Sequence, residues 1–203
     1  MTTAQPRRIE RRKERTRHAL MEAGRKMIGE VGVAGLRIQE VTAAADIGLG
    51  SFYTYFSSKE DFVQAIVADS LRELADTMAR GRSGATDPAV VTAEATCRAI
   101  RLAFDEPTFA QLLINLSHSE ELFSATMYPQ ARNVVARGVQ EGRFSTPDID
   151  ISVTYIISAA LATIRQILAG NHEEGVEFIQ AEIALRTLGL GNVESRAIAT
   201  SIR

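Results

Sequence analysis

Residues 38–59 read IQEVTAAADIGLGSFYTYFSSK and contain two short helix patterns on either side of a tight turn. Apolar residues at helical spacing predict the first helix over about residues 38–45. The turn is expected at Asp46-Ile47-Gly48, because Asp tolerates the left-handed backbone region and Gly adopts it freely. The second helix is expected over about residues 49–56. Two short helices joined by a three-residue turn predict a helix-turn-helix, whose second helix can lie in the major groove of DNA.

Longer helices are expected on both sides of this motif. The first runs from about Arg8 to Val31, and its apolar stripe consists of Leu20, Ala23 and Met27. After the motif, Ser57 followed three residues later by Glu60 fits a capping box that opens a helix through about Arg80. The side chains expected in the core of this small unit include Phe52, Phe56, Phe62 and Ile66.

The second helix of the motif offers side chains that suit contact with DNA. Its outward face combines hydrogen-bonding groups with one apolar tip and has no carboxylate to repel phosphate; its residues are Leu49, Ser51, Tyr53, Thr54 and Tyr55. Gly48 and Gly50 leave the start of the helix free of bulk, so backbone N–H groups can approach the DNA. Lys59 is placed to meet a phosphate. Taken singly, the tyrosines and Lys59 also fit ordinary surface positions, but their combination favours a DNA-binding surface.

The charge distribution agrees with such a surface. Residues 1–60 carry 11 Lys and Arg against 7 Asp and Glu, whereas residues 61–203 carry 12 against 18. A basic first third indicates that this end meets a polyanion. Its N-terminal arm contains Arg7, Arg8, Arg11, Arg12, Lys13, Arg15 and Arg17. A flexible basic arm can enter a minor groove or follow phosphates; the alternative is a disordered, solubilising tail.

Residues 38–59 resemble the DNA-binding signature of the TetR family of transcriptional regulators. The matching residues are Ala45, Ile47, Gly50, Ser51, Phe52, Tyr53, Phe56, Lys59 and Glu60. The resemblance covers roughly residues 10–70, and a weaker one at residues 184–190 is similar to the closing helix of many members. It implies contacts to phosphates or bases at Arg37, Gln39, Leu49, Ser51, Tyr53, Thr54, Tyr55 and Lys59. It also implies a homodimer through helices at about 148–169 and 173–188, and a ligand pocket in the C-terminal domain.

The sequence departs from the family pattern at four positions. Arg37 replaces the usual Thr that caps the first helix of the motif, so this cap is weaker or supplied otherwise, and Arg37 is free to meet a phosphate. Asp46 stands where the turn usually has Gly. Gly48 replaces the usual Ser or Thr cap of the second helix, and Thr42 replaces an Ala. These departures affect contact details and leave the motif intact.

The rest of the chain predicts an all-α fold. Helices are expected at about 88–105, 107–117, 119–141, 148–169 and 173–188, after a Gly- and Ser-containing break at 81–88. We expect an N-terminal three-helix helix-turn-helix domain with its basic arm over residues 1–57, and a C-terminal helical bundle that dimerises over residues 58–203. The helix at 148–169 is apolar nearly all round, so it must be buried on several sides, in part by another subunit.

Aromatic and apolar residues with a few polar groups among them suit a small-molecule site in the C-terminal domain. The candidate ligand-binding residues are Phe104, Leu112, Asn115, Leu116, His118, Phe123, Met127, Tyr128 and Tyr155. Each of them also fits an ordinary core or interface position. Arg132 suits a carboxylate or phosphate on a ligand, although a surface ion pair with Glu120 or Glu121 is the simpler expectation. The lone Cys97 is expected to be a small buried hydrophobe.

Several classes of protein are disfavoured. One cysteine allows no intramolecular disulfide, and no pair of histidines has metal-ligand spacing on one helix face, so we expect no metal and no cofactor. Neither a nucleophile elbow nor a phosphate-binding Gly-rich loop is present, so we expect no enzyme. No signal peptide pattern is seen, and the longest charge-free run, residues 151–164, falls short of the ~20 residues that span a bilayer. A cytoplasmic protein without a membrane segment is expected.

The pattern as a whole predicts a sequence-specific DNA-binding regulator. We expect a repressor that a small, largely apolar ligand releases from a palindromic operator. The alternative is a DNA-binding adaptor whose C-terminal domain binds another protein, and a third, weaker reading is an enzyme with an incidental helix-turn-helix. An open internal cavity would favour the first reading, and a filled interior with a large exposed apolar patch would favour the second.

Overall fold

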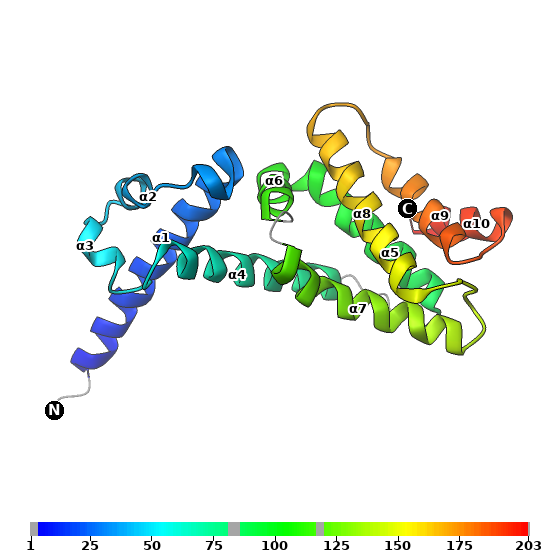
Figure 1. The fold of residues 1–203 in the computed structure, drawn as a ribbon, viewed down its shortest axis with the longest axis horizontal. Coiled ribbons are helices and arrows are strands. Elements are labelled where there is room, and N and C mark those ends of the chain that lie inside the picture. Colours follow the sequence, from blue (N-terminus) through cyan, green and yellow to red (C-terminus); the bar gives the residue numbers. More distant parts are fainter. Residues whose placement is uncertain (1–3, 81–85, 117–119, 203) are drawn as a thin grey trace. The chain divides into compact units, whose positions relative to one another are not determined.

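The computed structural model describes residues 4–80, 86–116 and 120–202, and it describes side chains within 10–74, 86–115 and 128–202. All regular secondary structure in these ranges is helical (Figure 1), which confirms the predicted all-α class. The helices are α1 (Ala4–Gly35), α2 (Ile38–Ala44), α3 (Leu49–Phe52), α4 (Lys59–Arg80), α5 (Pro88–Asp105), α6 (Pro107–Leu116), α7 (Glu120–Gln140), α8 (Ile149–Leu168), α9 (Val176–Thr187) and α10 (Asn192–Ser201).

The chain forms two compact units, Met1–Ser70 and Leu71–Arg203. This division falls within α4, whereas the boundary expected between residues 57 and 58 precedes that helix. The helix therefore begins in the first unit and ends in the second. Helix α1 begins at Ala4, so the basic arm continues the helix instead of preceding it, and Gly32, with φ of 71° and ψ of 172°, interrupts the helix near the expected end at Val31.

Aromatic packing forms the core of the first unit, as predicted. Phe52, Phe56 and Phe62 are all buried, and their ring centroids lie between 4.7 and 5.5 Å apart. Ile66 and Leu20 are also fully buried. Edge-to-face and tilted pairs of this kind stabilise a core beyond the burial of their area. The cluster joins α3, the turn after it and α4 into one structure.

The N-terminus of α4 is capped one residue later than the sequence predicted. Ser58, not Ser57, is the capping side chain, because its Oγ accepts the backbone N–H of Asp61 at 3.1 Å. In return, the Asp61 carboxylate accepts the backbone N–H of Ser57 at 2.8 Å. Consecutive serines followed by Glu60 and Asp61 permit two registers of the capping box, and the chain uses the second.

Helix α5 is the central helix of the second unit, where it contacts α6, α7, α8, α9 and α10. Its buried residues Ala89, Ala93 and Cys97 are small and recur every four residues, so they form a shallow stripe along one side of the helix. Ala181 and Leu185 of α9 belong to the same buried cluster. Small side chains allow two helices to approach closely, which explains the extensive packing of α5 against α9.

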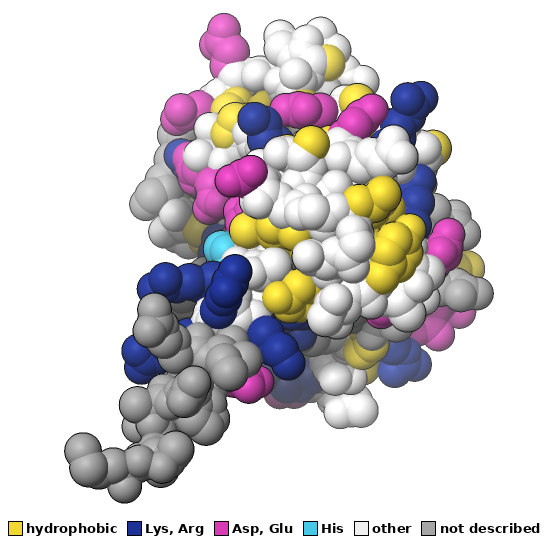
Figure 2. Space-filling view, turned by 90° about the vertical axis from the view of Figure 1, so that its left-hand side faces the viewer, with side chains coloured by type: hydrophobic (Ala, Val, Ile, Leu, Met, Phe, Trp, Pro, Cys, Tyr) yellow, Lys and Arg dark blue, Asp and Glu magenta, His cyan; other side chains and the backbone are white. Residues whose placement is uncertain are grey.

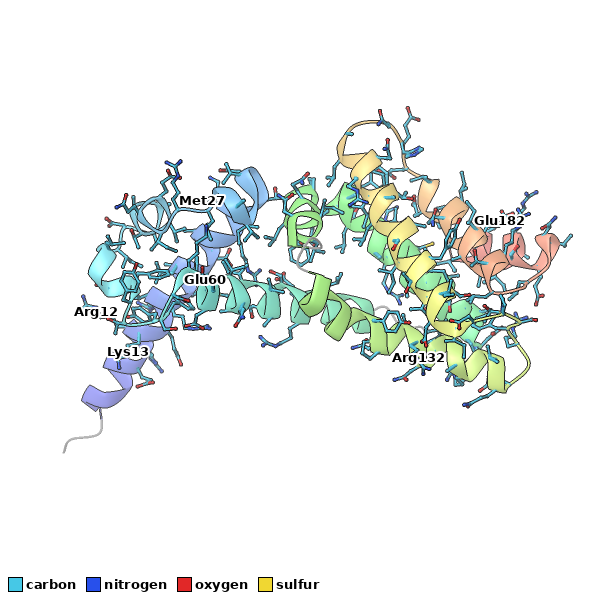
Figure 3. All side chains as sticks on the ribbon, in the orientation of Figure 1. Arg12, Lys13, Met27, Glu60, Arg132 and Glu182 are labelled. Atoms are coloured by element: carbon cyan, nitrogen blue, oxygen red, sulfur yellow. The ribbon has the colours of Figure 1, made fainter. Side chains whose placement is uncertain are left out.

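Helix α10 was not predicted from the sequence. Its buried residues are Ser195 and Ala199, which are too small and too polar to give a clear apolar stripe. The predicted final helix ends as expected, at Thr187, and Gly189 with φ of 90° turns the chain toward α10. Arg196 of α10 pairs with Glu182 of α9, which is labelled in Figure 3, at 3.2 Å.

Helix α8 is less buried in the single chain than its composition predicted. Its buried residues are Ser152, Val153, Ile164 and Ile167, while Ile151 and Tyr155 are 70% and 56% exposed. By length and composition alone, α8 is the one helix in the described residues that could cross a membrane, and an apolar core helix meets the same criterion. The charge-free run of residues 151–164 is shorter than α8, because Asp150 and Arg165 lie within the helix near its two ends.

Arg143, after α7, links two other parts of the second unit. Its guanidinium forms paired bonds of 2.9 and 3.0 Å to the Asp87 carboxylate at the N-terminus of α5, and a third of 2.7 Å to Glu194 of α10. Asp87 also caps α5 by accepting the Ala89 N–H. The hydrogen bonds from Arg143 are the main reason that the pKa of Asp87 lies below its ordinary value.

Substitution of Gly24 by Ala tests the packing between α1 and α4. A Cβ at this position would lie 2.6 Å from Ile66 Cδ1 and even closer to Phe62. Overpacking costs about 1–3 kcal/mol, which exceeds the gain of about 1 kcal/mol in helix propensity. We expect Gly24→Ala to lower the free energy of unfolding in chemical denaturation. The control is Gly50→Ala, where a Cβ meets no atom within 4 Å and no loss is expected; equal behaviour of both variants would contradict the packing argument.

Replacement of Arg143 by Ala should lower the free energy of unfolding by about 1–2 kcal/mol near neutral pH, since Asp87 is partly exposed and solvent screens the pair. Because the pKa of Asp87 is depressed in the folded state, its contribution is present above the unfolded pKa of about 3.9. It is lost as the pH falls through the folded pKa. Denaturation curves of the variant and the wild type should therefore converge at acidic pH. Arg186→Ala, whose ion pair spans 3.9 Å at the surface, is the control; a difference that persists unchanged in acid would rule out this role for Asp87.

Candidate nucleic-acid interface and apolar cavity

The turn between α2 and α3 has the hydrogen bonds of a Schellman motif. The Ile47 N–H donates to the Thr42 carbonyl at 2.9 Å, and the Asp46 N–H donates to the Ala43 carbonyl at 3.2 Å. This motif requires a left-handed residue, and Asp46 supplies it with φ of 55°. Gly48, by contrast, has an extended backbone with φ of −64°, so the predicted left-handed role falls on Asp46 alone. The turn explains how Asp is accepted where Gly is usual.

Helix α3 is shorter than predicted, because it ends at Phe52 instead of residue 56. Tighter turns follow, in which the Thr54 N–H donates to the Ser51 carbonyl and the Tyr55 N–H donates to the Phe52 carbonyl. The Phe56 N–H also donates to the Phe52 carbonyl, at 3.1 Å. The chain thus keeps a helix-like course long enough to bring the rings of Phe52 and Phe56 into one core.

Most predicted DNA-contact residues are exposed. The exposed positions are Arg37, Gln39, Gly48, Leu49, Gly50, Ser51, Tyr53 and Thr54, and the half-buried ones are Tyr55 and Lys59. Tyr53 is 59% exposed even though its ring packs against the edge of Phe52. Arg37 has an extended backbone at the start of α2 and forms no side-chain cap, as its chemistry suggested. Its guanidinium lies 3.8 Å from Glu40 and is 78% exposed.

A basic surface lies beside the start of α1, where Lys and Arg side chains gather in Figure 2. Figure 3 labels two of its members, Arg12 and Lys13. The exposed basic side chains described in this segment are Arg11, Arg12, Lys13, Arg15 and Arg17. Arg17 lies over the ring of Phe56 at 5.4 Å, which ties the basic segment to the aromatic core. The side chains of Arg7 and Arg8 lie outside the described residues.

A cavity of about 160 Å³, partly open to solvent, lies among α5, α7 and α8 in the second unit. Its lining is mostly aliphatic and consists of Val91, Thr92, Ala95, Thr96, Arg98, Ala99, Gln130, Ala131, Val134, Val135, Val153, Ile156, Ile157 and Ala160. Small side chains on α5 create the space, because Ala95 and Ala99 stand where larger residues would fill it. An apolar cavity with a few polar groups has the chemistry of a small-molecule site.

The predicted ligand-binding residues are not the residues that line this cavity. Phe104 is half-buried, and Leu112 is buried. The Asn115 side-chain oxygen accepts a hydrogen bond from Gln111 at 3.2 Å. Tyr155 is exposed on α8, and Tyr128 is half-buried on α7. The side chains of the remaining candidates, Leu116, His118, Phe123 and Met127, lie outside those that the structure describes. Sequence reasoning selected large and aromatic side chains, whereas this cavity exists where side chains are small.

Arg132, labelled on α7 in Figure 3, pairs with a residue that the sequence did not suggest. Its Nε donates to the Asp150 carboxylate at 2.7 Å. The side chains of Glu120 and Glu121, the partners expected from the sequence, lie outside the described residues. The Tyr128 hydroxyl donates to the same carboxylate at 3.0 Å. These two bonds hold the pKa of Asp150 below its ordinary value, with Arg132 as the larger cause. The cluster fixes the start of α8 against α7.

Buried Glu177 is a charged residue that sequence reasoning missed. One carboxylate oxygen accepts from Arg101 at 3.0 Å and the other accepts the Gly175 N–H at 2.7 Å. Its backbone carbonyl accepts the Cys97 thiol at 3.5 Å. Burial, and then the Glu177 carboxylate, raise the pKa of Cys97 to about 12, so the thiol stays protonated, as expected of a buried hydrophobe. No sequence pattern distinguished Glu177 from the exposed Glu173 and Glu174.

The described residues contain no group of three or more His, Cys, Asp or Glu side chains able to hold a metal ion. Two regions of the described structure have a chemistry that suits binding. One is an exposed, carboxylate-free segment beside a basic helix, and the other is an apolar cavity.

Two family models match the chain. A model described as bacterial regulatory proteins of the tetR family matches residues 20–66, and a model of the tetracyclin repressor-like C-terminal domain matches residues 87–201. The HTH-type transcriptional repressor DhaR of Mycobacterium sp. (strain GP1) is 35% identical over 74 residues. That match covers 36% of this chain and 37% of the repressor's length.

Solved structures agree in fold. RolR in complex with the ligand resorcinol is 27% identical, with a TM-score of 0.71 over 94% of this chain and 96% of that one. A TetR family transcription regulator from Marinobacter aquaeolei VT8 has a TM-score of 0.76 over 88% of this chain and 98% of that one. It is 16% identical, so this second likeness concerns the fold alone.

Proposed function

The chain belongs to the TetR family and is a DNA-binding transcriptional regulator, and we propose that it is a homodimeric repressor that a small, largely apolar ligand releases from a palindromic operator. The exposed, carboxylate-free surface of α3 carries the DNA-binding part of this proposal. The cavity among α5, α7 and α8 carries the ligand part. Such a protein acts by binding, not by catalysis, and works in the cytoplasm, where its operator lies.

The DNA contacts fall into two groups. Residues of α3 and the turn after it present hydroxyl groups and one apolar side chain, which suit base edges and thymine methyl groups in a major groove. Lys59 and the basic face of α1 suit phosphates, which set affinity and register without reading sequence. The proposed contacts are Arg37, Gln39, Gly48, Leu49, Gly50, Ser51, Tyr53, Thr54, Tyr55 and Lys59.

The unburied face of α8 supports a homodimer. Ile151 and Tyr155 of α8, and Ile179 and Ile183 of α9, are at least 40% exposed in the single chain. Large apolar side chains on two neighbouring helices are typical of a surface that another protein covers. A second copy of the chain would bring its own α8 and α9 to this face. Two recognition segments about one DNA turn apart, roughly 34–36 Å, would then read a near-palindrome.

Ligand control follows from the same helices. Helix α8 lines the cavity and also carries the proposed dimer face, while Leu74 of α4 packs in a cluster with α5, α6 and α8. A ligand that favours one arrangement of these helices shifts the population of the dimer and thereby its affinity for DNA. The apolar cavity supports this reading over a protein-binding adaptor, which would need no such space. The solved RolR complex with resorcinol also supports a small ligand in a protein of this fold.

Tyr53→Ala should weaken specific DNA binding by about tenfold to a hundredfold, which is the affinity that one good contact to a base contributes. Its exposure means that folding should be little affected. Binding of wild type and variant to the intergenic DNA beside the gene, at one stated salt concentration, measures this. Val193→Ala, on an 86% exposed side chain of α10, is the control and should bind as wild type. Equal affinity of the Tyr53 variant for this DNA would remove Tyr53 from the recognition surface.

Charged substitutions on the proposed dimer face should produce monomers. We expect Tyr155→Lys and Ile179→Lys each to weaken self-association at least tenfold, because each places a charge where apolar side chains would be desolvated. Sedimentation velocity over a range of concentrations measures the dimer fraction. Val193→Lys carries the same change away from this face and should stay dimeric. Dimers that survive both substitutions, or that the Val193 change dissociates, would assign the interface elsewhere.

A further inference from the structure

The volume of the cavity indicates how large a group fits inside it. An engineered apolar cavity of about 150 Å³ in another protein binds benzene, while sites for drug-sized ligands occupy about 300–1,000 Å³. The cavity among α5, α7 and α8 has a volume of about 160 Å³. It therefore matches one six-membered ring with one small substituent.

One polar group in the wall has no partner within the described part of the protein. The Thr92 side chain lines the cavity and is 9% exposed, and its Oγ1 is buried without a hydrogen bond. The neighbouring Thr96 differs, since its hydroxyl donates to the Thr92 carbonyl at 2.9 Å. Buried hydroxyls are nearly always hydrogen-bonded, so we expect the Thr92 hydroxyl to bond a polar atom of a ligand inside the cavity. A hydroxyl can donate and accept, and a ligand hydroxyl satisfies either need.

The charge in the wall favours an uncharged ligand. Arg98 also lines the cavity, but its guanidinium lies 3.5 Å from the Glu94 carboxylate, one helical turn away. Both side chains are largely buried, with 20% and 10% of their surface exposed. A ligand carboxylate beside Arg98 would lie close to the Glu94 carboxylate and would be repelled by it. The pair is thus already balanced without a charged ligand.

We infer that the ligand is an uncharged single-ring aromatic alcohol, a molecule of the phenol class, and that Thr92 selects it by hydrogen-bonding its hydroxyl. This inference rests on the proposed ligand-controlled function and names the chemistry of its effector. The aliphatic side chains Val135, Ile156 and Val153 enclose the ring. Thr92 is then the residue that distinguishes a hydroxyl from a methyl group on the same ring.

The test compares phenol, toluene and benzoate as probes of the full-length protein by titration calorimetry. Toluene has nearly the shape of phenol without its hydroxyl, and benzoate adds the charge. Wild type should bind phenol about tenfold more tightly than toluene, corresponding to one satisfied hydrogen bond. Thr92→Val keeps the shape of the side chain and removes the hydroxyl, so it should abolish this preference. The apo variant should be at least as stable as wild type, because no buried polar atom is left unpaired.

Two further variants define the site. Thr96→Val should retain the preference for phenol, since the Thr96 hydroxyl is already bonded to the backbone. Ala95→Leu fills the cavity and should abolish binding of both phenol and toluene. Tightest binding by benzoate, an unchanged preference in Thr92→Val, or binding of 1-naphthol but no single-ring probe would each overturn the inference.

Release of operator DNA by the same probes separates the inference from the proposed function. Phenol that binds through Thr92 without releasing DNA would sustain the ligand class and contradict ligand-controlled repression. Release of DNA by a different compound, with no binding of phenol or toluene, would sustain the control and contradict the ligand class.

Discussion

Burial of the Phe52 ring is the interaction on which the DNA-binding unit depends. Helix α3 has only four residues, and backbone hydrogen bonds cannot hold so short a helix in water. The ring centroid of Phe52 lies 5.2 Å from that of Phe62 in the long α4, so the core fixes α3 in place. Ser51 and Tyr53, on either side of Phe52 in the chain, remain exposed. One short segment therefore supplies both the core contact and the surface offered to DNA.

The second unit uses α5 in a comparable way, with small residues on two of its sides. Ala93 and Cys97 let α9 approach closely, while Ala95 and Ala99 on another side leave a cavity toward α7 and α8. Close packing and empty space thus arise from the same kind of side chain. The two sides differ in the helices that face them. Helix α9 packs closely against the stripe of Ala93 and Cys97, whereas the residues that face Ala95 leave space.

The sequence predicted the elements well where periodicity and turn chemistry were strong. The helix-turn-helix, the Phe core and the order of the main helices all followed from spacing. It failed where the decision was one of register or of packing between distant segments. Ser57 and Ser58 offered two caps, α10 had too few large apolar residues to be seen, and Arg132 met Asp150 across the chain. The cavity lining was missed because alanines and valines give no sign in sequence of the space they leave.

The small volume of the cavity also bounds the sensitivity of the ligand response proposed for this protein. Binding energy is bounded by about 1.5 kcal/mol for each non-hydrogen atom in the best tiny ligands. A ligand of about seven such atoms can therefore contribute at most about 10 kcal/mol, and part of that free energy is consumed in shifting the protein between its two states. With about 1–3 kcal/mol consumed in that shift, half-saturation falls no lower than the high nanomolar to micromolar range. The proposed ligand-controlled regulator would therefore respond to an abundant compound and not to traces of one.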